Sequence, residues 1–292
     1  MKKARKEKIS QATLSKLKKL KDILSQMGNV LVAFSGGVDS TFLLRVASDV
    51  LGERVLAITA SSETYPEREV EEASRLAKSL NVRQKVIPTH ELRNPDFSSN
   101  PPARCYFCKQ ELFSRLKKIA AREGIPYVLD GSNYEDRLDY RPGTRAAKEL
   151  GIRSPLKEAH LLKNEIRILS RILNLPTWNK PSLACLASRI PYQTRIERQT
   201  LQQIGEAEDF LRKLGFSQVR VRHHGEVARI EIGPNEFLKI VKQGMSEKIV
   251  RRLKKIGYLY ITLDLGGYRT GSMNEALKLK RRQNKDQKDT VN

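Results

Sequence analysis

The stretch VLVAFSGGVDSTFLL, Val30 to Leu44, places a short polar turn between two apolar runs. The first run has the composition of a buried strand, and the second begins a helical pattern. A turn that ends a strand and starts a helix directs its backbone N–H groups and the positive end of the helix dipole toward one point. That point favours an anion, so the stretch predicts a phosphate-binding loop.

The residues of this turn suit contact with phosphate groups. Gly36 and Gly37 let the backbone approach a ligand closely, and the hydroxyls of Ser35 and Ser40 supply hydrogen bonds. Asp39 offers the carboxylate oxygens that Mg²⁺ prefers. The residues expected to bind the nucleotide here are Ser35, Gly36, Gly37, Val38, Asp39 and Ser40. The turn lacks the Gly-Lys-Ser/Thr ending of a Walker A loop, which indicates that a different phosphate bond is cut.

Apolar runs and helical patterns alternate after the turn. This alternation predicts an α/β fold with a parallel sheet and right-handed crossovers. Strands are expected at 30–34, 55–59, 82–87 and 127–129, and helices near 39–50, 67–80 and 109–123. Ligands bind such sheets beyond the carboxyl ends of the strands, where the segments 59–62 and 130–133 are expected. Ordinary capped turns would have the same composition as these two segments.

The order of elements changes after residue 194. A helix near 197–214 precedes two alternating strands around a His-His-Gly turn, then helical stretches near 235–255 and a last strand, GYLYITLDL. We therefore expect four parts, with the last two forming a smaller α+β domain and its tail. They are a basic amphipathic helix at 1–28, the parallel-sheet domain at 29–194, a substrate or oligomerisation domain at 195–277, and a basic tail at 278–292.

The chain of 292 residues has a formal net charge of +22 at pH 7, which suits phosphate-bearing ligands and RNA alike. Residues 1–21 carry nine Lys or Arg and one Glu, and residues 278–292 carry six Lys or Arg and two Asp. Solvated ends of the chain are the simplest interpretation of these charges. No apolar run has the length of a membrane span or the position of a secretion signal, so a soluble cytoplasmic protein without membrane contact is expected.

Three cysteines in so long a chain cannot form a disulfide framework and suit metal or redox chemistry instead. Cys105 and Cys108 form a C-x-x-C pair, which is compatible with half of a zinc site, a redox pair or the start of a helix. Together with Cys185 they would provide three thiolates to an iron–sulfur cluster, whose sites usually take four. One iron would then lack a protein ligand and accept an additional sulfide.

The motif SGGVDS resembles the pyrophosphate loop of the N-type ATP pyrophosphatases. The resemblance implies an adenine nucleotide alpha hydrolase-like fold for the parallel-sheet domain. It implies cleavage of ATP between the α- and β-phosphates and transfer of AMP to a carbonyl oxygen. It further implies that the backbone of Ala60 and Gly131 flank the adenine.

Two further motifs narrow this resemblance. PSLACLASRIPY at 181–192 and GYRTGSMNE at 267–275, together with SGGVDS, look like the LarE family over nearly the whole chain. This likeness implies an ATP-dependent sulfurtransferase that adenylylates the carboxylates of pyridinium-3,5-biscarboxylic acid mononucleotide and converts them to thiocarboxylates. The product would serve the synthesis of the nickel-pincer nucleotide of lactate racemase. The likeness also implies a homo-oligomer, expected to be a hexamer.

The family resemblance includes two sources of sulfur. In one branch, a single cysteine that matches Cys185 gives up its own sulfur and becomes dehydroalanine. In the other branch, cysteines that match Cys105, Cys108 and Cys185 hold a [4Fe-4S] cluster, which takes sulfide from a separate donor. Because all three cysteines are present, the resemblance implies ATP, Mg²⁺ and a [4Fe-4S] cluster as cofactors, with Mg²⁺ on Asp39.

Polar residues close to Cys185 complete the expected site. Ser188 and Arg189 are expected to line the same pocket, where an arginine can bind a carboxylate or phosphate in a bidentate way. A surface ion pair is the alternative for Arg189. The expected catalytic residues are Cys185, Asp39, Ser188 and Arg189.

Arginines of the second domain suit the phosphate of the substrate. Arg220 and Arg222 are two positions apart on one expected strand and therefore share a face. Arg269 lies in the C-terminal motif and is a third candidate for this phosphate. Further charged candidates in this domain are Arg229, Glu206, Glu208 and Glu231, for which solvated surface is the alternative.

Two other functions are compatible with similar residues. Pyrophosphate-loop enzymes that thiolate tRNA also use three cysteines and a [4Fe-4S] cluster, and a basic protein suits RNA. We see neither a second C-x-x-C pair nor an appended RNA-binding module, so nucleic acid is not the expected partner. A nucleotide-binding regulator whose cysteines hold a structural metal is the non-enzymatic alternative.

Overall fold

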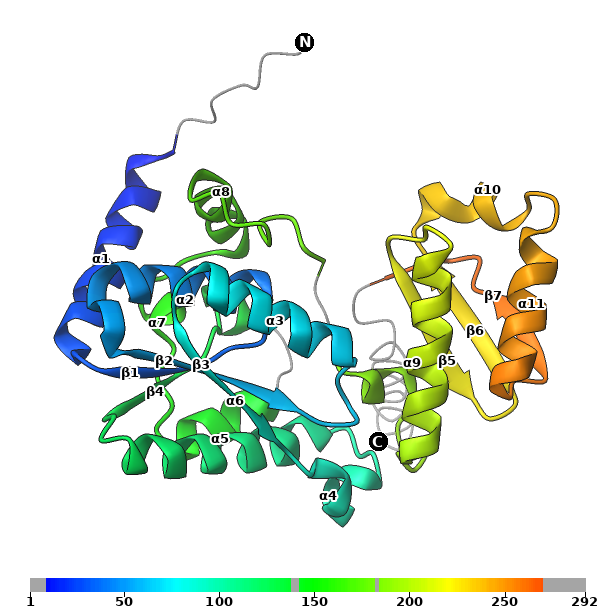
Figure 1. Ribbon diagram of the computed structural model, residues 1–292, viewed down its shortest axis with the longest axis horizontal. Helices are drawn as coiled ribbons and strands as arrows, with labels where there is room; N and C mark the ends of the chain where they lie inside the picture. The colour runs from blue at the N-terminus through cyan, green and yellow to red at the C-terminus, as the bar shows by residue number, and fades with distance from the viewer. Residues whose placement is uncertain (1–8, 138–141, 182–183, 270–292) are drawn as a thin grey trace, which may run out of the picture. The chain divides into compact units, whose positions relative to one another are not determined.

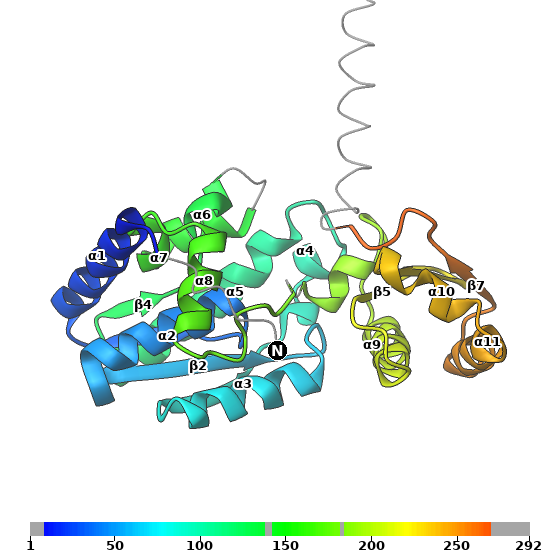
Figure 2. The same ribbon diagram turned by 90° about the horizontal axis from the view of Figure 1, so that it is seen from above.

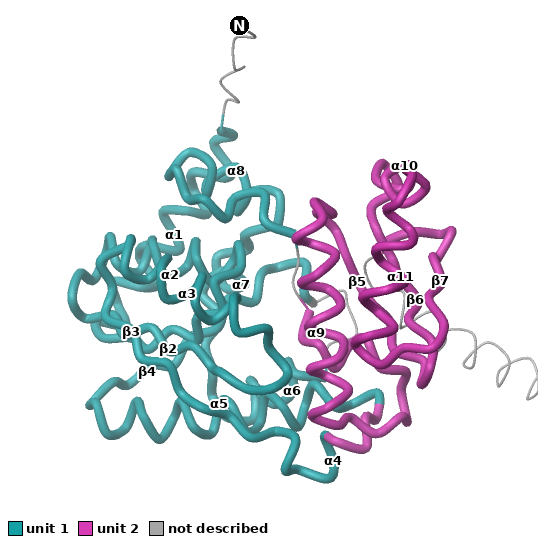
Figure 3. Tube along the Cα trace, turned by 45° about the vertical axis from the view of Figure 1, so that its right-hand side comes forward, with its two compact units in different colours: residues 1–97, 102–183 teal, residues 98–101, 184–292 magenta. Residues whose placement is uncertain are grey.

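The computed structural model describes residues 9–137, 142–181 and 184–269. The basic tail at 278–292, residues 1–8 of the basic N-terminal segment, residues 182–183 of the cysteine motif and residues 270–275 of the C-terminal motif lie outside the described residues. The chain forms two compact units, residues 1–97 with 102–183 and residues 98–101 with 184–292 (Figure 3). Among the described helices, none combines the length and apolar character needed to cross a membrane.

Unit 1 is built on a four-stranded parallel sheet (Figure 1). Its strands are β1 (Val30–Ala33), β2 (Val55–Ser61), β3 (Arg83–Pro88) and β4 (Tyr127–Leu129), in the order β3-β2-β1-β4. Val30 of β1 is in register with Val55 of β2 and with Tyr127 of β4. This sheet confirms the α/β fold that the alternation of apolar and helical segments predicts.

Helices cover both faces of this sheet. α1 (Gln11–Met27), α2 (Val38–Leu51) and α3 (Glu67–Ser79) lie on one side, and α5 (Arg104–Arg122) and α6 (Pro142–Glu149) on the other (Figure 1). Alternate residues of β1 serve the two layers, because Val30 and Val32 pack with the first group and Leu31 packs with Phe113 of α5. The sheet is therefore buried on both faces, as parallel sheets are.

α1 is held to unit 1 by a stripe of apolar side chains. Ser10 caps its first turn by accepting a hydrogen bond from the Thr13 backbone N–H at 3.1 Å. Leu20 and Leu24, one turn apart, are completely buried in the core. Lys16 forms an ion pair at 2.8 Å with Glu165 of α8 (Lys163–Ile172), which lies beside α2 (Figure 2).

Several elements of unit 1 were not predicted from the sequence. Besides α6 and α8 they include α4 (Pro95–Ser98) and α7 (Pro155–Glu158). The helix expected near 109–123 begins at Arg104, so it contains both cysteines of the C-x-x-C pair. Short 3₁₀ turns occupy Gly52–Arg54, Glu91–Arg93, Tyr134–Arg137, Leu186–Arg189 and Pro234–Glu236 along the whole described chain.

Unit 2 is a smaller α+β structure. Its sheet has the order β5-β6-β7, with β5 (Val219–His224) antiparallel to β6 (Val227–Ile232) and β7 (Tyr260–Leu263) parallel to β6. Leu211 and Leu253 are buried against this sheet, and they come from α9 (Arg198–Lys213) and α11 (Met245–Ile256). The helical stretch expected near 235–255 is divided, because α10 (Phe237–Ile240) ends before Gly244, which adopts a left-handed conformation.

Residues 98–101 join unit 2 through a buried asparagine. The side-chain amide of Asn100 donates hydrogen bonds to the backbone carbonyls of Pro191 at 2.7 Å and Thr194 at 3.1 Å. The backbone N–H of Ile196 donates to the carbonyl of Ser98 at 2.8 Å. These contacts hold residues 191–196, at the end of the PSLACLASRIPY motif and just after it, against residues 98–100 within unit 2.

Candidate functional site

The turn after β1 has the form of an anion-binding loop. Gly36 has a φ of 67°, and a Cβ at this position would lie 3.1 Å from Ala73 of α3. Both the left-handed backbone conformation and the close approach of α3 therefore favour glycine. The Ser35 and Ser40 hydroxyl oxygens are 3.1 Å apart, and Ser40 also donates to the Gly37 carbonyl at 3.3 Å. No side chain of the described residues caps the N-terminus of α2, and the first N–H groups of this helix are suited to bind an anion.

The loop after β4 meets this turn. A Cβ on Gly131 would lie 3.0 Å from the Ser40 backbone nitrogen and 3.2 Å from its Cα, a tight contact with backbone that favours glycine at this position. Because β2 and β4 flank β1 on opposite sides, the loops after β1 and β4 leave the sheet at its topological switch point. Ligands of open α/β sheets bind at this point.

Asp39 provides an oxygen that suits a cation. Its Oδ2 accepts a hydrogen bond at 2.5 Å from Nζ of Lys163, which is the first residue of α8. Its Oδ1 is buried and has no hydrogen-bond partner among the described residues. A buried carboxylate oxygen without a partner is unfavourable, and a divalent cation with oxygen ligands would relieve this cost. The geometry of Asp39 therefore fits Mg²⁺.

A second lysine touches the loop from another segment. Lys180 Nζ lies 3.3 Å from the Gly36 carbonyl oxygen, 3.0 Å from Glu69 and 2.9 Å from Glu72 of α3. Its side chain is 12% exposed, and these three acceptors match the three N–H groups of an ammonium. The Lys180 carbonyl in turn accepts from Arg167 of α8 at 2.9 Å. Lys180 thus joins the loop, α3 and the segment that leads to the cysteine motif.

Ala60 lies at the carboxyl end of β2, opposite Ile87 of β3. The preceding residue, Thr59, donates from its hydroxyl to the Phe34 carbonyl at 2.8 Å, which holds the ends of β1 and β2 together. Farther along the loop, Ser62 and Thr64 donate to the buried carboxylate of Glu91 at 2.7 and 2.5 Å. Unit 1 therefore brings Ala60 to the same edge of the sheet as the loop after β1.

Cys105 and Cys108 are the second and fifth residues of α5, three positions apart and thus on one face of the helix. Cys105 is exposed, Cys108 is half-buried, and neither is in a disulfide. Cys185 belongs to unit 2, whereas this pair belongs to unit 1. Within the described ranges, no group of three or more His, Cys, Asp or Glu side chains is placed to hold a metal ion.

In unit 2, Cys185 begins a short 3₁₀ turn that ends at Arg189. Ser188 donates to the Cys185 carbonyl twice, from its backbone N–H at 3.0 Å and from its hydroxyl at 2.8 Å. Arg189 is 1% exposed and makes a bidentate pair with Glu208 of α9, at 2.8 and 3.0 Å. Burial alone would raise the pKa of Glu208, but Arg189, Arg212 and Arg220 together lower it to about 2.

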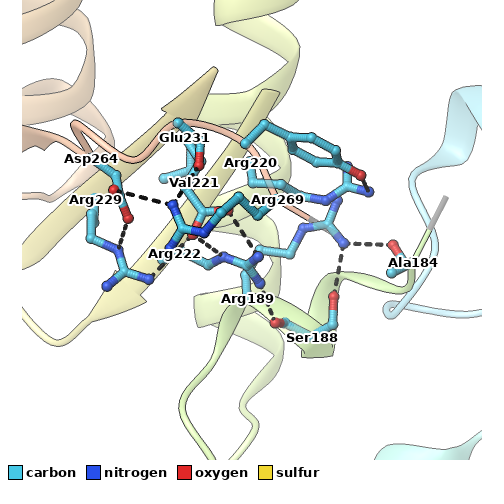
Figure 4. Close-up of polar contacts among 12 residues, drawn as sticks. Ala184, Ser188, Arg189, Arg220, Val221, Arg222, Arg229, Glu231, Asp264 and Arg269 are labelled. Carbon is cyan, nitrogen blue, oxygen red and sulfur yellow. Dashed lines mark hydrogen bonds and ion pairs between the residues drawn. The ribbon is translucent and has the colours of Figure 1, made fainter. Parts of the chain in front are cut away.

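The arginines expected to bind phosphate lie in one network of charges around this turn (Figure 4). Arg222 pairs with Glu231 through two contacts of 2.9 Å and donates to the Ser188 carbonyl at 2.7 Å. Arg220 lies over the Tyr268 ring, 5.1 Å from its centroid, and burial together with the nearby charge of Arg189 lowers the pKa of Arg220 to about 10.

The C-terminal motif joins the edge of this network. Arg269 lies 3.8 Å from Asp264, which also lies 3.5 Å from Arg229 of β6. Arg229 in turn contacts Glu231 at 3.2 Å. Unit 2 therefore brings Arg222 to the turn that carries Cys185, Ser188 and Arg189. Arg269 joins this network through Asp264, Arg229 and Glu231. Glu206 lies apart from this network and is 3.7 Å from Arg252 of α11.

Lys163 and Lys180 are residues of the site that were not predicted from the sequence. Both belong to segments that follow β4, far from the loop in sequence. Lys163 is the first residue of a helix with a marked apolar stripe, Ile166 and Leu169, and this stripe was the available signal. An isolated lysine such as Lys180 carries no comparable signal.

Comparison of the sequence with known proteins finds relatives along most of the chain. Residues 13–121 match the family model described as NAD synthase. An uncharacterized protein of Synechocystis sp. is 44% identical over 90% of this chain and 98% of its own length. An uncharacterized protein of Methanocaldococcus jannaschii is 32% identical over 88% of this chain and 98% of its own length.

A third relative has a described activity. The pyridinium-3,5-bisthiocarboxylic acid mononucleotide synthase of Lactiplantibacillus plantarum is 40% identical over 258 residues, which cover 87% of this chain and 92% of the synthase. Identity at this level over nearly the full length of both proteins extends through unit 1 and unit 2. The chain therefore belongs to the same family as this synthase, the LarE family.

Proposed function

We propose that this protein is an ATP-dependent sulfurtransferase that adenylylates the carboxylates of pyridinium-3,5-biscarboxylic acid mononucleotide and converts them to thiocarboxylates. The observation that carries the proposal is the loop after β1, with its uncapped helix N-terminus and the unpaired Oδ1 of Asp39. The relationship to the Lactiplantibacillus plantarum synthase supports this choice of substrate. The product would enter the synthesis of a nickel-pincer nucleotide.

The residues of unit 1 suit the first half of this reaction. A substrate carboxylate oxygen would attack the α-phosphorus of ATP, and the bond between the α- and β-phosphates would break to release pyrophosphate. The N–H groups at the start of α2 and the ammonium of Lys163 suit the negative charge on the leaving group. Asp39 would hold Mg²⁺, which supplies positive charge to the phosphates when bound. Ala60 and Gly131 would flank the adenine.

The second half transfers sulfur to the activated carbon. A sulfur nucleophile would form a C–S bond, the C–O bond to AMP would break, and AMP would leave with one of the carboxylate oxygens. In unit 2, Cys185 would lie at this step, on a turn held by Ser188 and Arg189. Arg220 and Arg269 would contribute positive charge toward the phosphate of the mononucleotide.

For the source of sulfur we propose the cluster rather than the sacrifice of Cys185. Three thiols in the chain support this choice, and Cys105 and Cys108 share one face at the positive end of α5. When bound, a [4Fe-4S] cluster held by three thiolates would supply an iron site that accepts sulfide from a separate donor. Sacrifice of Cys185 would instead convert this residue to dehydroalanine. We also propose, from the family resemblance, that the protein is a homo-oligomer.

An anaerobic assay tests the proposal. The full chain is supplied with ATP, Mg²⁺, sulfide and the mononucleotide dicarboxylate, and thiocarboxylate and pyrophosphate are quantified. We expect both products to exceed one equivalent per chain. Asp39→Asn should remove both, whereas the matched change Asp49→Asn, in an exposed ion pair at the other end of α2, should keep both.

Three other results of this assay would change the proposal. Product limited to one equivalent, with dehydroalanine at position 185, would replace the cluster by the sacrificial route. Pyrophosphate release with tRNA in place of the mononucleotide would overturn the substrate. Absence of pyrophosphate release with either substrate would overturn the proposed activity.

A further inference from the structure

Arg189 of unit 2 is 1% exposed, and all three of its guanidinium nitrogens donate hydrogen bonds. Its Nε and Nη2 donate to the two oxygens of Glu208, at 2.8 and 3.0 Å. Its Nη1 contacts the Ala184 carbonyl at 2.5 Å, the Cys185 carbonyl at 2.9 Å and the Ser188 hydroxyl at 3.0 Å. Each of the three guanidinium nitrogens is therefore engaged, and the two N–H groups of Nη1 are shared among three acceptors.

The acceptors of Arg189 divide into two groups. Glu208 lies on α9 and provides a fixed point, because its carboxylate also accepts from Arg212 at 2.8 Å and from the Val221 backbone N–H of β5 at 3.1 Å. The other acceptors belong to the backbone and hydroxyl of the turn that carries Cys185. Arg189 therefore connects the position of this turn to the rigid helix and sheet of unit 2.

A second arginine holds the same turn from the sheet. Arg222 of β5 donates to the Ser188 carbonyl at 2.7 Å while its other contacts pair it with Glu231, which is fully buried (Figure 4). The carbonyls of Cys185 and Ser188 are thus both held by buried guanidinium groups, whose own carboxylate partners come from α9 and β6. The hydrogen bonds that the two arginines donate to this turn go to backbone carbonyls and to the Ser188 hydroxyl.

We propose that Arg189 and Glu208 are positioning residues that fix the Cys185 turn for sulfur transfer, rather than residues that bind the substrate. The inference rests on the proposed function, in which Cys185 lies at the sulfur-transfer step. Because Arg189 is 1% exposed, a substrate carboxylate could reach it only if one of these contacts opened, and the buried acceptor left without its partner would be costly. By holding the turn in one position, the two residues would fix the Cys185 thiolate, a proposed ligand of the sulfur-carrying cluster, for the transfer step.

The test compares three changes with a matched control. Glu208→Gln removes the negative charge that pairs with Arg189. Arg189→Lys keeps the positive charge but loses the planar guanidinium. Arg212→Gln removes a hydrogen bond to Glu208 and leaves the pair of Arg189 with Glu208 in place. The control is Glu236→Gln, because Glu236 is also a buried carboxylate of unit 2 but accepts from Ser217, Gln218 and Lys239 instead.

Two measurements separate positioning from substrate binding. The first is the rate at which iodoacetamide alkylates each cysteine of the cluster-free protein, followed by peptide mass spectrometry, with Cys105 and Cys108 of unit 1 as internal references. We expect Glu208→Gln and Arg189→Lys to change the Cys185 rate several-fold while the reference rates stay constant. Arg212→Gln should have a smaller effect in the same direction, and Glu236→Gln should have none.

The second measurement divides the reaction into its halves. We expect the two main variants to release pyrophosphate normally and to lose about 100-fold in the rate of thiocarboxylate formation, with an unchanged KM for the mononucleotide. A raised KM together with unchanged Cys185 alkylation would overturn the inference in favour of substrate binding. If Glu208→Gln does not fold, the Arg212→Gln result decides in the same way. Failure of the proposed function would appear instead as no thiocarboxylate from the wild-type protein, and the alkylation rates would still test the anchor.

Discussion

Lys163 Nζ lies 2.5 Å from Asp39 Oδ2 and joins the first residue of α8 to the second residue of α2. The pair places an ammonium beside the N-terminus of α2, where ATP phosphates are proposed to bind. The other Asp39 oxygen is without a hydrogen-bond partner among the described residues. Asp39 would hold a cation through this oxygen and Lys163 would supply positive charge to a phosphate, so the pair is an arrangement suited to nucleotide binding.

Lys163→Met should therefore lower the rate of pyrophosphate release by about 100-fold, because it removes one donor to the charge that develops on the leaving group. Pyrophosphate release with saturating mononucleotide measures this rate. Lys78→Met, which changes an exposed lysine of α3, is the control and should keep the wild-type rate. An equal rate in both variants would contradict the role of Lys163.

Gly131→Ala should weaken ATP binding and destabilise unit 1 by about 1–3 kcal/mol, because the new methyl group overlaps the backbone of Ser40. Thermal unfolding and ATP titration of the same samples measure the two effects. Gly205→Ala in α9 is the matched change, since its Cβ would meet only Leu186 at 3.5 Å. That variant should be as stable as the wild type or more so.

Lys180→Gln should reduce pyrophosphate release by about tenfold, since the Gly36 carbonyl and the carboxylates of Glu69 and Glu72 lose a shared cation. Lys180→Arg should recover part of the rate by keeping the charge. If both variants release pyrophosphate at the wild-type rate, Lys180 supports only the local fold.

Glu208 should make the stability of unit 2 depend on pH. Its pKa of about 2 in the folded protein lies below the ordinary value of 4.5, so its contribution is present above pH 4.5 and is lost as the pH falls toward 2. The difference corresponds to about 3 kcal/mol. Denaturant unfolding should show that the free energy of unfolding of the wild type exceeds that of Glu208→Gln above pH 4.5, and that this difference shrinks as the pH falls through this range. A constant advantage down to pH 2 would contradict the depressed pKa.

The fold of unit 1 was predictable because its sheet depends on local patterns. Strands at Val30, Val55 and Tyr127 are short apolar runs followed by helical periodicity, and the SGGVDS turn carries its own geometry in its glycines. α6 and α7 escaped prediction because they are short and begin at prolines, Pro142 and Pro155, which sequence patterns associate equally with turns.

The surroundings of Arg189 were not predictable for a different reason. Its partner Glu208 lies 19 positions away on α9, and both residues are buried. A sequence gives no measure of that burial, and charged residues are usually exposed. The spacing of Arg220 and Arg222 correctly indicates one strand, but it does not reveal that Glu231 already pairs with Arg222.

The most direct test of the central claim follows oxygen from the substrate. Pyridinium-3,5-biscarboxylic acid mononucleotide labelled with ¹⁸O in its carboxylates is incubated with the protein, ATP, Mg²⁺ and sulfide without oxygen, and the AMP is analysed by mass spectrometry. Adenylylation followed by attack of sulfur predicts one ¹⁸O atom in AMP for each thiocarboxylate formed. Unlabelled AMP, or ADP in place of AMP, would contradict activation of the carboxylate by adenylylation.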